Sequence, residues 1–394
     1  MSARPTTIGL YFGLLQLFFT LCWTVYAIYL PALAGVAGIP RESVLLILIL
    51  DQAIFMVADF ATGVWADRVS KVLGRIGMWA AVATLVSCAA FLALPFIAPV
   101  GATVFLALTI IWAITSSALR APPLMLLGKY AGKPAIPWLA SLTMLGYGVA
   151  GALAPYLAVH LRGIDPRLPF ALSSIALVLT AFGLSWAERN LAQRATNPPP
   201  VEAPRQPISH TAVGFALAVI VLALGFQLHF QINSPPAFLR FASQEQLEWL
   251  MPVFWIGFNV AMFPAGVLGN RLGPYPVMAI SALLGGAAIL ATVLASSLDF
   301  LIGAQLVAGA AWGFVLVAAF TLAFAIGKDG REGTMAGLLF SALAVATLTR
   351  IAVVAGGLPA NAALKPLLLW APVACWILAG IALLYAARAR LHAH

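Results

Sequence analysis

The sequence has 394 residues, of which 63% are hydrophobic and only 8% are charged, and its mean hydropathy is +1.02. Soluble domains are nearer half apolar and about a quarter charged, so this composition excludes a water-soluble fold and indicates an integral membrane protein. The formal net charge of +9 is explained by basic residues at the membrane borders, which set the topology. It does not indicate nucleic acid binding, because the sequence has no Lys/Arg-rich run with interleaved aromatic residues.

Twelve apolar runs follow one another along the chain, each long enough to cross a bilayer as a helix, which needs about 20 residues. They are far longer than the ~10-residue alternating strands of a membrane barrel, so we expect an all-α membrane protein. The expected spans are residues 8–30, 43–64, 76–97, 101–120, 136–160, 168–187, 211–232, 248–269, 276–297, 299–327, 334–356 and 365–387.

The longest polar break, residues 188–210, is rich in proline and charge and cannot build a core. It predicts a flexible linker between a bundle of six helices (residues 1–187) and a second bundle of six (residues 211–394). The linker is expected in the cytoplasm, together with both chain termini.

The distribution of basic residues predicts this orientation. Of the 21 Lys and Arg residues, fifteen fall in segments on the side of the two termini, five fall on the other side, and Arg350 lies within a span. Since basic residues are retained on the cytoplasmic side, both termini are expected there, in the inner (plasma) membrane of the cell.

A short sequence repeats at matching places in the two bundles. GVWADR (residues 63–68) ends the second span and GVLGNR (residues 266–271) ends the eighth. Parallel internal repeats are typical of one large class of secondary transporters. Here the chain resembles the major facilitator superfamily over its whole length. That family's Gly-x-Leu-Ala-Asp-Arg-x-Gly-Arg/Lys signature corresponds to residues 63–71, with Trp65 in place of Leu and Ser70 in place of the second Gly.

The resemblance implies two six-helix bundles related by a pseudo-two-fold axis, alternating access, a monomer, and a latch between the bundles on the cytoplasmic side. In such a latch a glycine allows close helix packing, and an aspartate accepts hydrogen bonds from the start of a neighbouring helix, whose N-terminus is partly positive. The expected latch residues are Asp59, Gly63, Asp67, Arg68, Lys71, Gly266, Asn270 and Arg271. Asp59 is included because it lies one turn before Gly63 near the inner border, and the cavity is its alternative place. For the loop charges the alternative is that they only set the topology of the chain.

The fifth span resembles a second family signature, that of drug exporters that exchange protons. Its run Ala150-Gly-Ala-Leu-Ala154-Pro155 keeps the proline and small residues, but alanine replaces key glycines. This favours export coupled to protons, while the alternative is ordinary packing of small residues between helices.

Two opposite charges lie at similar depth on neighbouring spans. An ionisable group at mid-helix costs about 2.5–3.5 kcal/mol on insertion, so each should have a partner or a task. At 1.5 Å per residue, Asp51 and Arg350 lie about 12 Å and 9 Å from the outer border. In the family resembled, helices 2 and 11 are side by side. We therefore expect either an ion pair that gates the outer mouth and couples protons, or contact of Arg350 with an anionic substrate. A static pair or a snorkelling Arg350 is the plain alternative.

Other polar groups in the spans are less specific. Arg120 precedes Pro122-Pro123 and is expected to anchor the inner face, with a role in the cavity as the second interpretation. His229 lies in a segment whose polar residues alternate, which is the wrong period for one helix face. This indicates either local unwinding or a polar helix end at the membrane interface. The residues expected to line a substrate cavity are Gln16, Trp23, Tyr26, Tyr147, Gln227, His229, Trp255, Asn259, Gln305 and Trp312.

Together these residues describe an aromatic, weakly charged site suited to a small amphiphilic organic compound. The sequence predicts a secondary transporter, in first place for proton-coupled export of such a compound. Uptake or exchange of a small organic anion bound by Arg350 is the alternative, and a non-transporting membrane sensor or scaffold is a third. No enzymatic activity, cofactor or metal is expected. The three cysteines, Cys22, Cys88 and Cys375, lie in apolar runs without metal-binding spacing.

Overall fold

The computed structural model describes residues 5–73, 76–130, 135–193, 209–328 and 330–391. Within these residues twelve helical segments are long and apolar enough to cross a membrane, which confirms the expected spans and a multi-pass membrane protein. The helices of the first six spans are α1 (Pro5–Val36), α2 (Val44–Leu73), α3 (Gly77–Ile97), α4 (Ala102–Ser116), α5 (Ala121–Tyr130), α6 (Ile136–His160), α7 (Arg167–Ala181) and α8 (Leu184–Ala192).

The helices of the last six spans follow the same scheme, with one irregular segment. They are α9 (His210–Gln227), the π-helical η5 (Leu228–Asn233), α10 (Ser234–Phe238), α11 (Leu247–Leu250), α12 (Pro252–Leu272), α13 (Pro274–Val293), α14 (Leu298–Ile326), α15 (Glu332–Ala355) and α16 (Lys365–Leu391). The alternating polar segment around His229 is therefore a π-helical stretch within a continuous helical span, and not an unwound one. π-Helical turns insert an extra residue and are frequent at functional sites.

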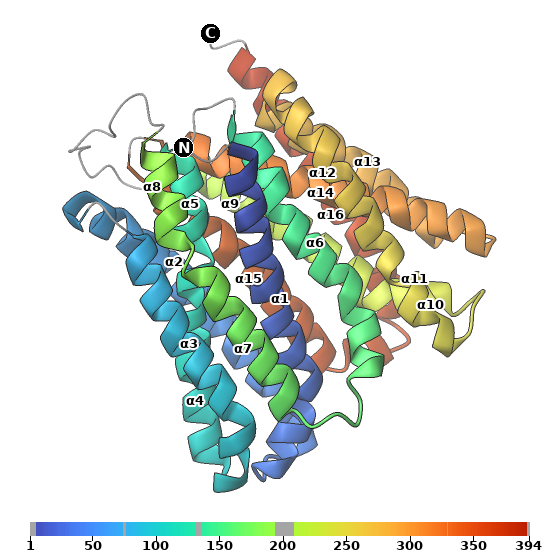
Figure 1. Cartoon of the computed structure of the whole chain (residues 1–394). Coiled ribbons are helices and arrows are strands. Elements are labelled where there is room, and N and C mark those ends of the chain that lie inside the picture. The colour runs from blue at the N-terminus through green and yellow to red at the C-terminus, as the bar shows by residue number, and fades with distance from the viewer. Residues whose placement is uncertain (1–4, 74–75, 131–134, 194–208, 329, 392–394) are drawn as a thin grey trace.

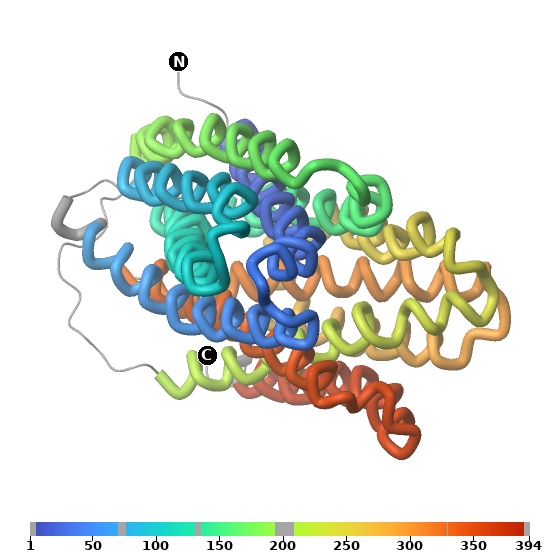
Figure 2. Tube along the Cα trace, turned by 90° about the horizontal axis from the view of Figure 1, so that it is seen from below, coloured from blue at the N-terminus to red at the C-terminus, as the bar shows by residue number. Residues whose placement is uncertain are grey.

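The spans form two groups. In the first, α1 packs against α6 and α7, and α3 packs against α4 and α7; in the second, α14 packs against α12 and α13, and α16 packs against α9 and α13. Figure 2 shows most of the blue-to-green spans toward the upper left and most of the yellow-to-red spans toward the right and below. The two groups meet along two seams, α2 with α15 and α6 with α12. Both chain termini lie at one end of the molecule (Figure 1), which we call the termini end.

The segment between the two bundles is shorter than the sequence predicts. Helix α8 continues to Ala192, and α9 already begins at His210. Glu188, expected in the linker, is buried and its carboxylate accepts hydrogen bonds from the backbone N–H groups of Ile76 (2.9 Å) and Gly77 (2.8 Å) at the start of α3. The free N–H groups at the start of α3 thus stabilise the Glu188 carboxylate, which the sequence analysis had placed in a solvent-exposed linker. Residues 194–208 of the expected linker lie outside the described residues.

Small residues allow the two seams to pack closely. Along α15, Gly333, Gly337 and Ser341 recur every fourth residue and face α2, where Gly333 lies against Gly63 and Ser341 Oγ donates a hydrogen bond to the carbonyl of Met56 (2.7 Å). Spacing of this kind brings helix backbones together in membranes. At the other seam the repeat's second copy does the same, because Gly266 of α12 lies against Trp138 of α6. The two copies of the repeat thus occupy equivalent seam positions.

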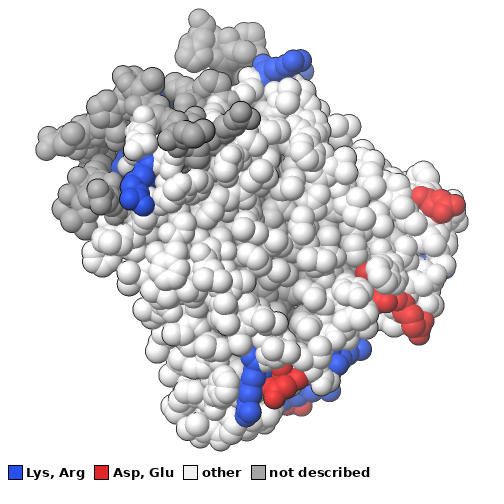
Figure 3. Space-filling model, viewed as in Figure 1, with Lys and Arg blue, Asp and Glu red and all other residues white. Residues whose placement is uncertain are grey.

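Charged side chains avoid the middle of the molecular surface. On the face shown in Figure 3, Lys, Arg, Asp and Glu lie near the two ends and the right-hand edge, and a broad band without them lies between. Many large apolar side chains are exposed, such as Leu179, Val260 and Leu284, each at least 58% exposed. An apolar belt of this kind fits the hydrocarbon core of a bilayer.

Candidate functional site

A central cavity of about 560 Å³ lies between the two bundles. Its walls come from α1, α2 and α6 of the first bundle and from α9, η5, α12, α14 and α15 of the second. It reaches Ala158, near the end of α6 that lies away from the termini end. Toward the termini end it stops at Phe320 and Phe340, whose rings meet edge-on with centroids 5.6 Å apart. Its size is that of pockets which hold small organic ligands.

Aromatic side chains form much of the wall on the side of the second bundle. The rings of Phe226 and Trp312 stack with centroids 4.6 Å apart, and Trp255 meets Phe226 edge-on at 5.9 Å. Tyr147 of the first bundle completes the wall, edge-on to Trp255 at 5.3 Å. Such rings offer a large apolar surface, and the Tyr and Trp side chains also carry polar atoms. The wall therefore suits a ligand with an apolar body.

Six of the ten residues expected in the cavity line it: Gln16, Trp23, Tyr147, Gln227, Trp255 and Trp312. Of the other four, Tyr26, His229 and Gln305 lie in the interior of their bundles, and Asn259 lies at the α6–α12 seam beside Gly148. Tyr26 packs between Trp23 and Trp112, and Asn259 Nδ2 donates to the carbonyl of Trp255 (2.9 Å).

His229 and Gln305 form a closed polar network inside the second bundle. His229 Nε2 lies 3.1 Å from Gln305 Oε1, and Gln305 Nε2 donates to Ser234 Oγ (2.8 Å). The Ser234 hydroxyl in turn donates to the carbonyl of His229 (2.9 Å), within the π-helical stretch. Because each member has a partner, this network ties η5 to α14 and does not present a free group to the cavity.

Asp51 is buried in the first bundle, where it meets α1. The hydroxyl of Tyr26 donates a hydrogen bond to Asp51 Oδ2 (2.7 Å), and Oδ1 has no partner among the described residues. The next residue, Gln52, lines the cavity. Asp51 is thus a carboxyl group close to the cavity wall that points away from it.

Arg350, on the helix α15 that packs along α2, borders the cavity from the second bundle. Its Nε is buried without a hydrogen-bond partner. Within the described part of the chain, no hydrogen bond or ion pair joins Arg350 to Asp51, so the expected pair is not formed in this conformation. The guanidinium group is instead available to whatever occupies the cavity.

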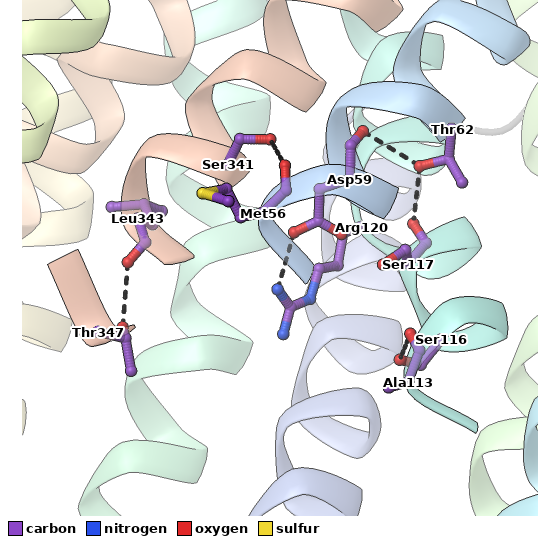
Figure 4. A network of polar contacts seen from close by, with 10 residues as sticks. All are labelled: Met56, Asp59, Thr62, Ala113, Ser116, Ser117, Arg120, Ser341, Leu343 and Thr347. Carbon is purple, nitrogen blue, oxygen red and sulfur yellow. Dashed lines mark hydrogen bonds and ion pairs between the residues drawn. The ribbon is translucent and has the colours of Figure 1, made fainter. Parts of the chain in front are cut away.

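A second arginine borders the cavity, and it is paired (Figure 4). Arg120 Nη1 forms an ion pair with Asp59 Oδ2 at 2.9 Å, and its guanidinium carbon lies 3.9 Å from the ring centre of Phe55. Asp59, expected in the latch, therefore binds within its own bundle, and Arg120, expected as an inner-face anchor, lies between Asp59 and the cavity. The sequence feature that accompanies this position is Pro122. The regular helix α4 ends at Ser116, before this proline, and Arg120 lies in the break between α4 and α5.

The expected latch aspartate makes its contact across the α2–α15 seam. Asp67 accepts hydrogen bonds from the N–H of Gly333 (2.7 Å) and from the N–H (2.7 Å) and hydroxyl (2.6 Å) of Thr334. These groups form the first turn of α15, where a carboxylate is stabilised by free N–H groups and by the helix dipole. The side chains of Arg68, Asn270 and Arg271 are exposed, and that of Lys71 lies outside the described residues.

The bundles also touch at the end opposite the termini, which sequence reasoning missed. His160 of α6 lies 3.7 Å from a carboxylate oxygen of Glu248 in α11. Tyr156 stacks on His160 with ring centroids 3.7 Å apart and leans on Trp249 at 5.5 Å. We call these four residues the distal contact. Its sequence signal is weak, because single aromatic residues at helix ends are common in membrane proteins.

Comparison with protein-family models finds none that matches, and comparison with curated proteins finds no relative. Comparison with solved structures gives matches over almost the whole chain. A bacterial homologue of the iron transporter ferroportin in an outward-facing state has a TM-score of 0.76 at 15% identity, with 98% of this chain and 100% of that chain covered. The human organic anion transporter MFSD10 (TETRAN) has a TM-score of 0.70 at 15% identity, with 97% and 99% covered.

A third match is a variant of the E. coli fucose:proton symporter FucP, with a TM-score of 0.66 at 14% identity and coverage of 97% and 99%. All three are transporters and not enzymes. Their names differ in cargo, and one of them is a symporter, so the likeness concerns the fold.

Proposed function

On the premise that the chain has the major facilitator superfamily fold, we propose that it carries a small amphiphilic organic anion across a membrane by alternating access. In this proposal Arg350 binds the anionic group and the aromatic wall binds the apolar body. A proton carried by Asp51 is the proposed coupling ion.

The observation that carries the proposal is the charge of the cavity. Two arginines border it, and none of its described lining residues is acidic. The charge of Arg120 is balanced by Asp59, whereas that of Arg350 has no ion-pair partner within the described residues. Because an unpaired charge in a membrane interior is costly, an anion bound at Arg350 would compensate it. This supports the organic anion, the alternative in the sequence analysis, as the substrate class.

Asp51 supports a coupling role through its position. It is fully buried with Tyr26 as hydrogen-bond donor, and it lies one residue from the cavity wall. We propose that Arg350 exchanges partners during the cycle, binding the substrate anion when loaded and Asp51 when empty. Protonation of Asp51 would remove its charge and so prevent that exchange. Because a protonated Asp51 leaves Arg350 to the anion, the proton and the anion are bound at the same time in this scheme. We therefore propose that they cross together, in place of the exchange that the fifth span suggests.

The contacts between the bundles support an outward-facing conformation for this structure, if the termini are cytoplasmic as proposed. Asp67 closes the α2–α15 seam at the termini end, while the cavity extends toward the other end. The reverse conformation requires that Asp67 release Thr334. This is the latch role that we propose for Asp67, with Gly63 allowing the seam to close.

The test is transport by the purified protein in proteoliposomes, with a proton gradient imposed in either direction. Radiolabelled 3-phenylpropanoate is the probe, and its neutral amide is the matched control compound. We expect the acid to be carried and the amide not, and Arg350→Gln to abolish transport while Arg350→Lys retains part of it. Arg162→Gln, at an exposed loop position, should have no effect. Equal transport of acid and amide, or full activity of Arg350→Gln, would overturn the proposal.

A further inference from the structure

Beside Arg350, the hydrogen bonds of the cavity wall determine which end of the Gln227 amide group faces Thr347. The hydroxyl of Thr347 donates to the carbonyl of Leu343 (3.0 Å), so its oxygen can only accept a second bond. Gln227 must therefore turn its amide nitrogen toward Thr347, at 3.1 Å. This leaves Gln227 Oε1 pointing elsewhere, buried and without a partner among the described residues.

This acceptor belongs to the same part of the wall as the free guanidinium group. Thr347 and Arg350 are three residues apart on α15 and so lie on one face of the helix. Gln227, Thr347 and Arg350 all border the cavity. Gln227 Oε1 is covered, but the residue borders the cavity, and the broad energy minimum of the terminal glutamine torsion permits the oxygen to turn toward a ligand.

The two unpartnered groups have complementary requirements. Arg350 offers only donors, and it requires an anion; Gln227 Oε1 offers only an acceptor, and it requires a donor. A simple carboxylate satisfies the first and leaves the second buried and unpaired, which is unfavourable. A carboxylate with a hydroxyl, amide N–H or ammonium group close to it satisfies both.

We propose that the carried anion bears a hydrogen-bond donor next to its acidic group, and that Gln227 selects for this donor. The inference rests on the proposed function, since it assumes an anion at Arg350. It narrows the substrate class from amphiphilic organic anions to those with a hydroxyl or nitrogen-bound hydrogen beside the anionic group. Gln227 is then a specificity-determining residue, and Arg350 the residue that holds the charge.

The test measures binding to the purified full-length protein by isothermal titration calorimetry with four matched compounds. These are 3-phenylpropanoate, which has no donor beside its carboxylate; 3-phenyllactate, which has a hydroxyl; phenylalanine, which has an ammonium group; and 3-phenylpropanamide, which has no charge. We expect 3-phenyllactate, which adds a neutral hydrogen bond, or phenylalanine, which adds a charged one, to bind at least roughly fivefold more tightly than 3-phenylpropanoate. Which of the two gains more identifies the donor as a hydroxyl or an ammonium group.

Variants of Gln227 separate selection from other roles. Gln227→Met and Gln227→Leu should bring the ratio of the two affinities close to one without weakening 3-phenylpropanoate, and thermal unfolding checks that each variant folds. Gln231→Leu, which removes another glutamine from the cavity wall, should leave the ratio unchanged.

Three results would overturn the inference in different ways. If the Gln227 variants weaken all acids equally, Gln227 only positions Arg350, and the proposed function stands without this selectivity. If the wild type binds the acids with equal affinity, the selectivity is absent. If the amide binds as tightly as the acids, or no acid binds, the proposed function itself fails and this inference fails with it.

Discussion

Replacing Asp67 by asparagine should open the α2–α15 seam at the termini end. Asp67 accepts three short hydrogen bonds from Gly333 and Thr334. Asparagine keeps one accepting oxygen, loses the charge, and turns an N–H₂ group toward donors. Since a hydrogen bond to a charged group contributes about 1.5–3 kcal/mol, we expect a loss of about 2–4 kcal/mol between the bundles. At about 1.4 kcal/mol per factor of ten, this shifts the closed-to-open ratio of the seam roughly 30- to 1,000-fold.

The assay is the rate at which a maleimide labels one cysteine in the seam. Ser341→Cys serves as the reporter, because Ser341 is 7% exposed and bonded to Met56 while the seam is closed. The three native cysteines are replaced beforehand. In this background Asp67→Asn should raise the labelling rate in proportion to the open fraction.

Glu188→Gln is the matched control for this prediction. Glu188 also binds the N-terminus of a helix, α3, but does so within one bundle. It should lower the thermal stability of the protein without raising the labelling rate. An unchanged rate in Asp67→Asn, or an equal rise in Glu188→Gln, would refute the reasoning.

Other contacts described above lead to further expected outcomes. Gly63→Leu should lower the transport rate more than tenfold, because its side chain would overlap the backbone of Gly333; Gly214→Leu, with open space around it, is the control in the same flux assay. Asp51→Asn should abolish the response of net flux to an imposed proton gradient while counterflow persists, and retained coupling would contradict its role. His160→Gln should alter flux less than about fivefold, since exposed ion pairs contribute about 0–1 kcal/mol. Cross-linking His160→Cys to Glu248→Cys should stop flux if the distal contact must open, and unaffected flux would show that it stays closed.

Much of the fold follows from the sequence because lipid imposes a simple rule on length and polarity. The twelve spans could be counted from apolar runs, since each backbone in the hydrocarbon core must be helical. The closeness of the α2–α15 seam could be anticipated from Gly63, and the contact of Asp67 with a helix N-terminus from its acidic side chain at a span end. The partner helix itself came from the family resemblance.

Side-chain partners were harder to predict because the rotation of each helix is not written in its sequence. Helix α2 is apolar on nearly every side, so no polar face shows which way Asp51 points. Depth alone matched it to Arg350, whereas rotation directs it to Tyr26. Likewise the π-helical stretch changes the number of residues per turn, so ordinary α-helical spacing does not show that His229 lies in the bundle and Gln231 at the cavity.

Helix α15 carries both of the contacts on which the proposed cycle depends. Gly333 lies in its first turn, against Asp67, and Arg350 borders the cavity seventeen residues later, about 25 Å along the same unbroken rod at 1.5 Å per residue. A rod of this length transmits a tilt from one end to the other without an intermediate relay. In the proposed cycle, an anion that draws Arg350 inward would therefore tilt α15 and strain the hydrogen bonds between its first turn and Asp67.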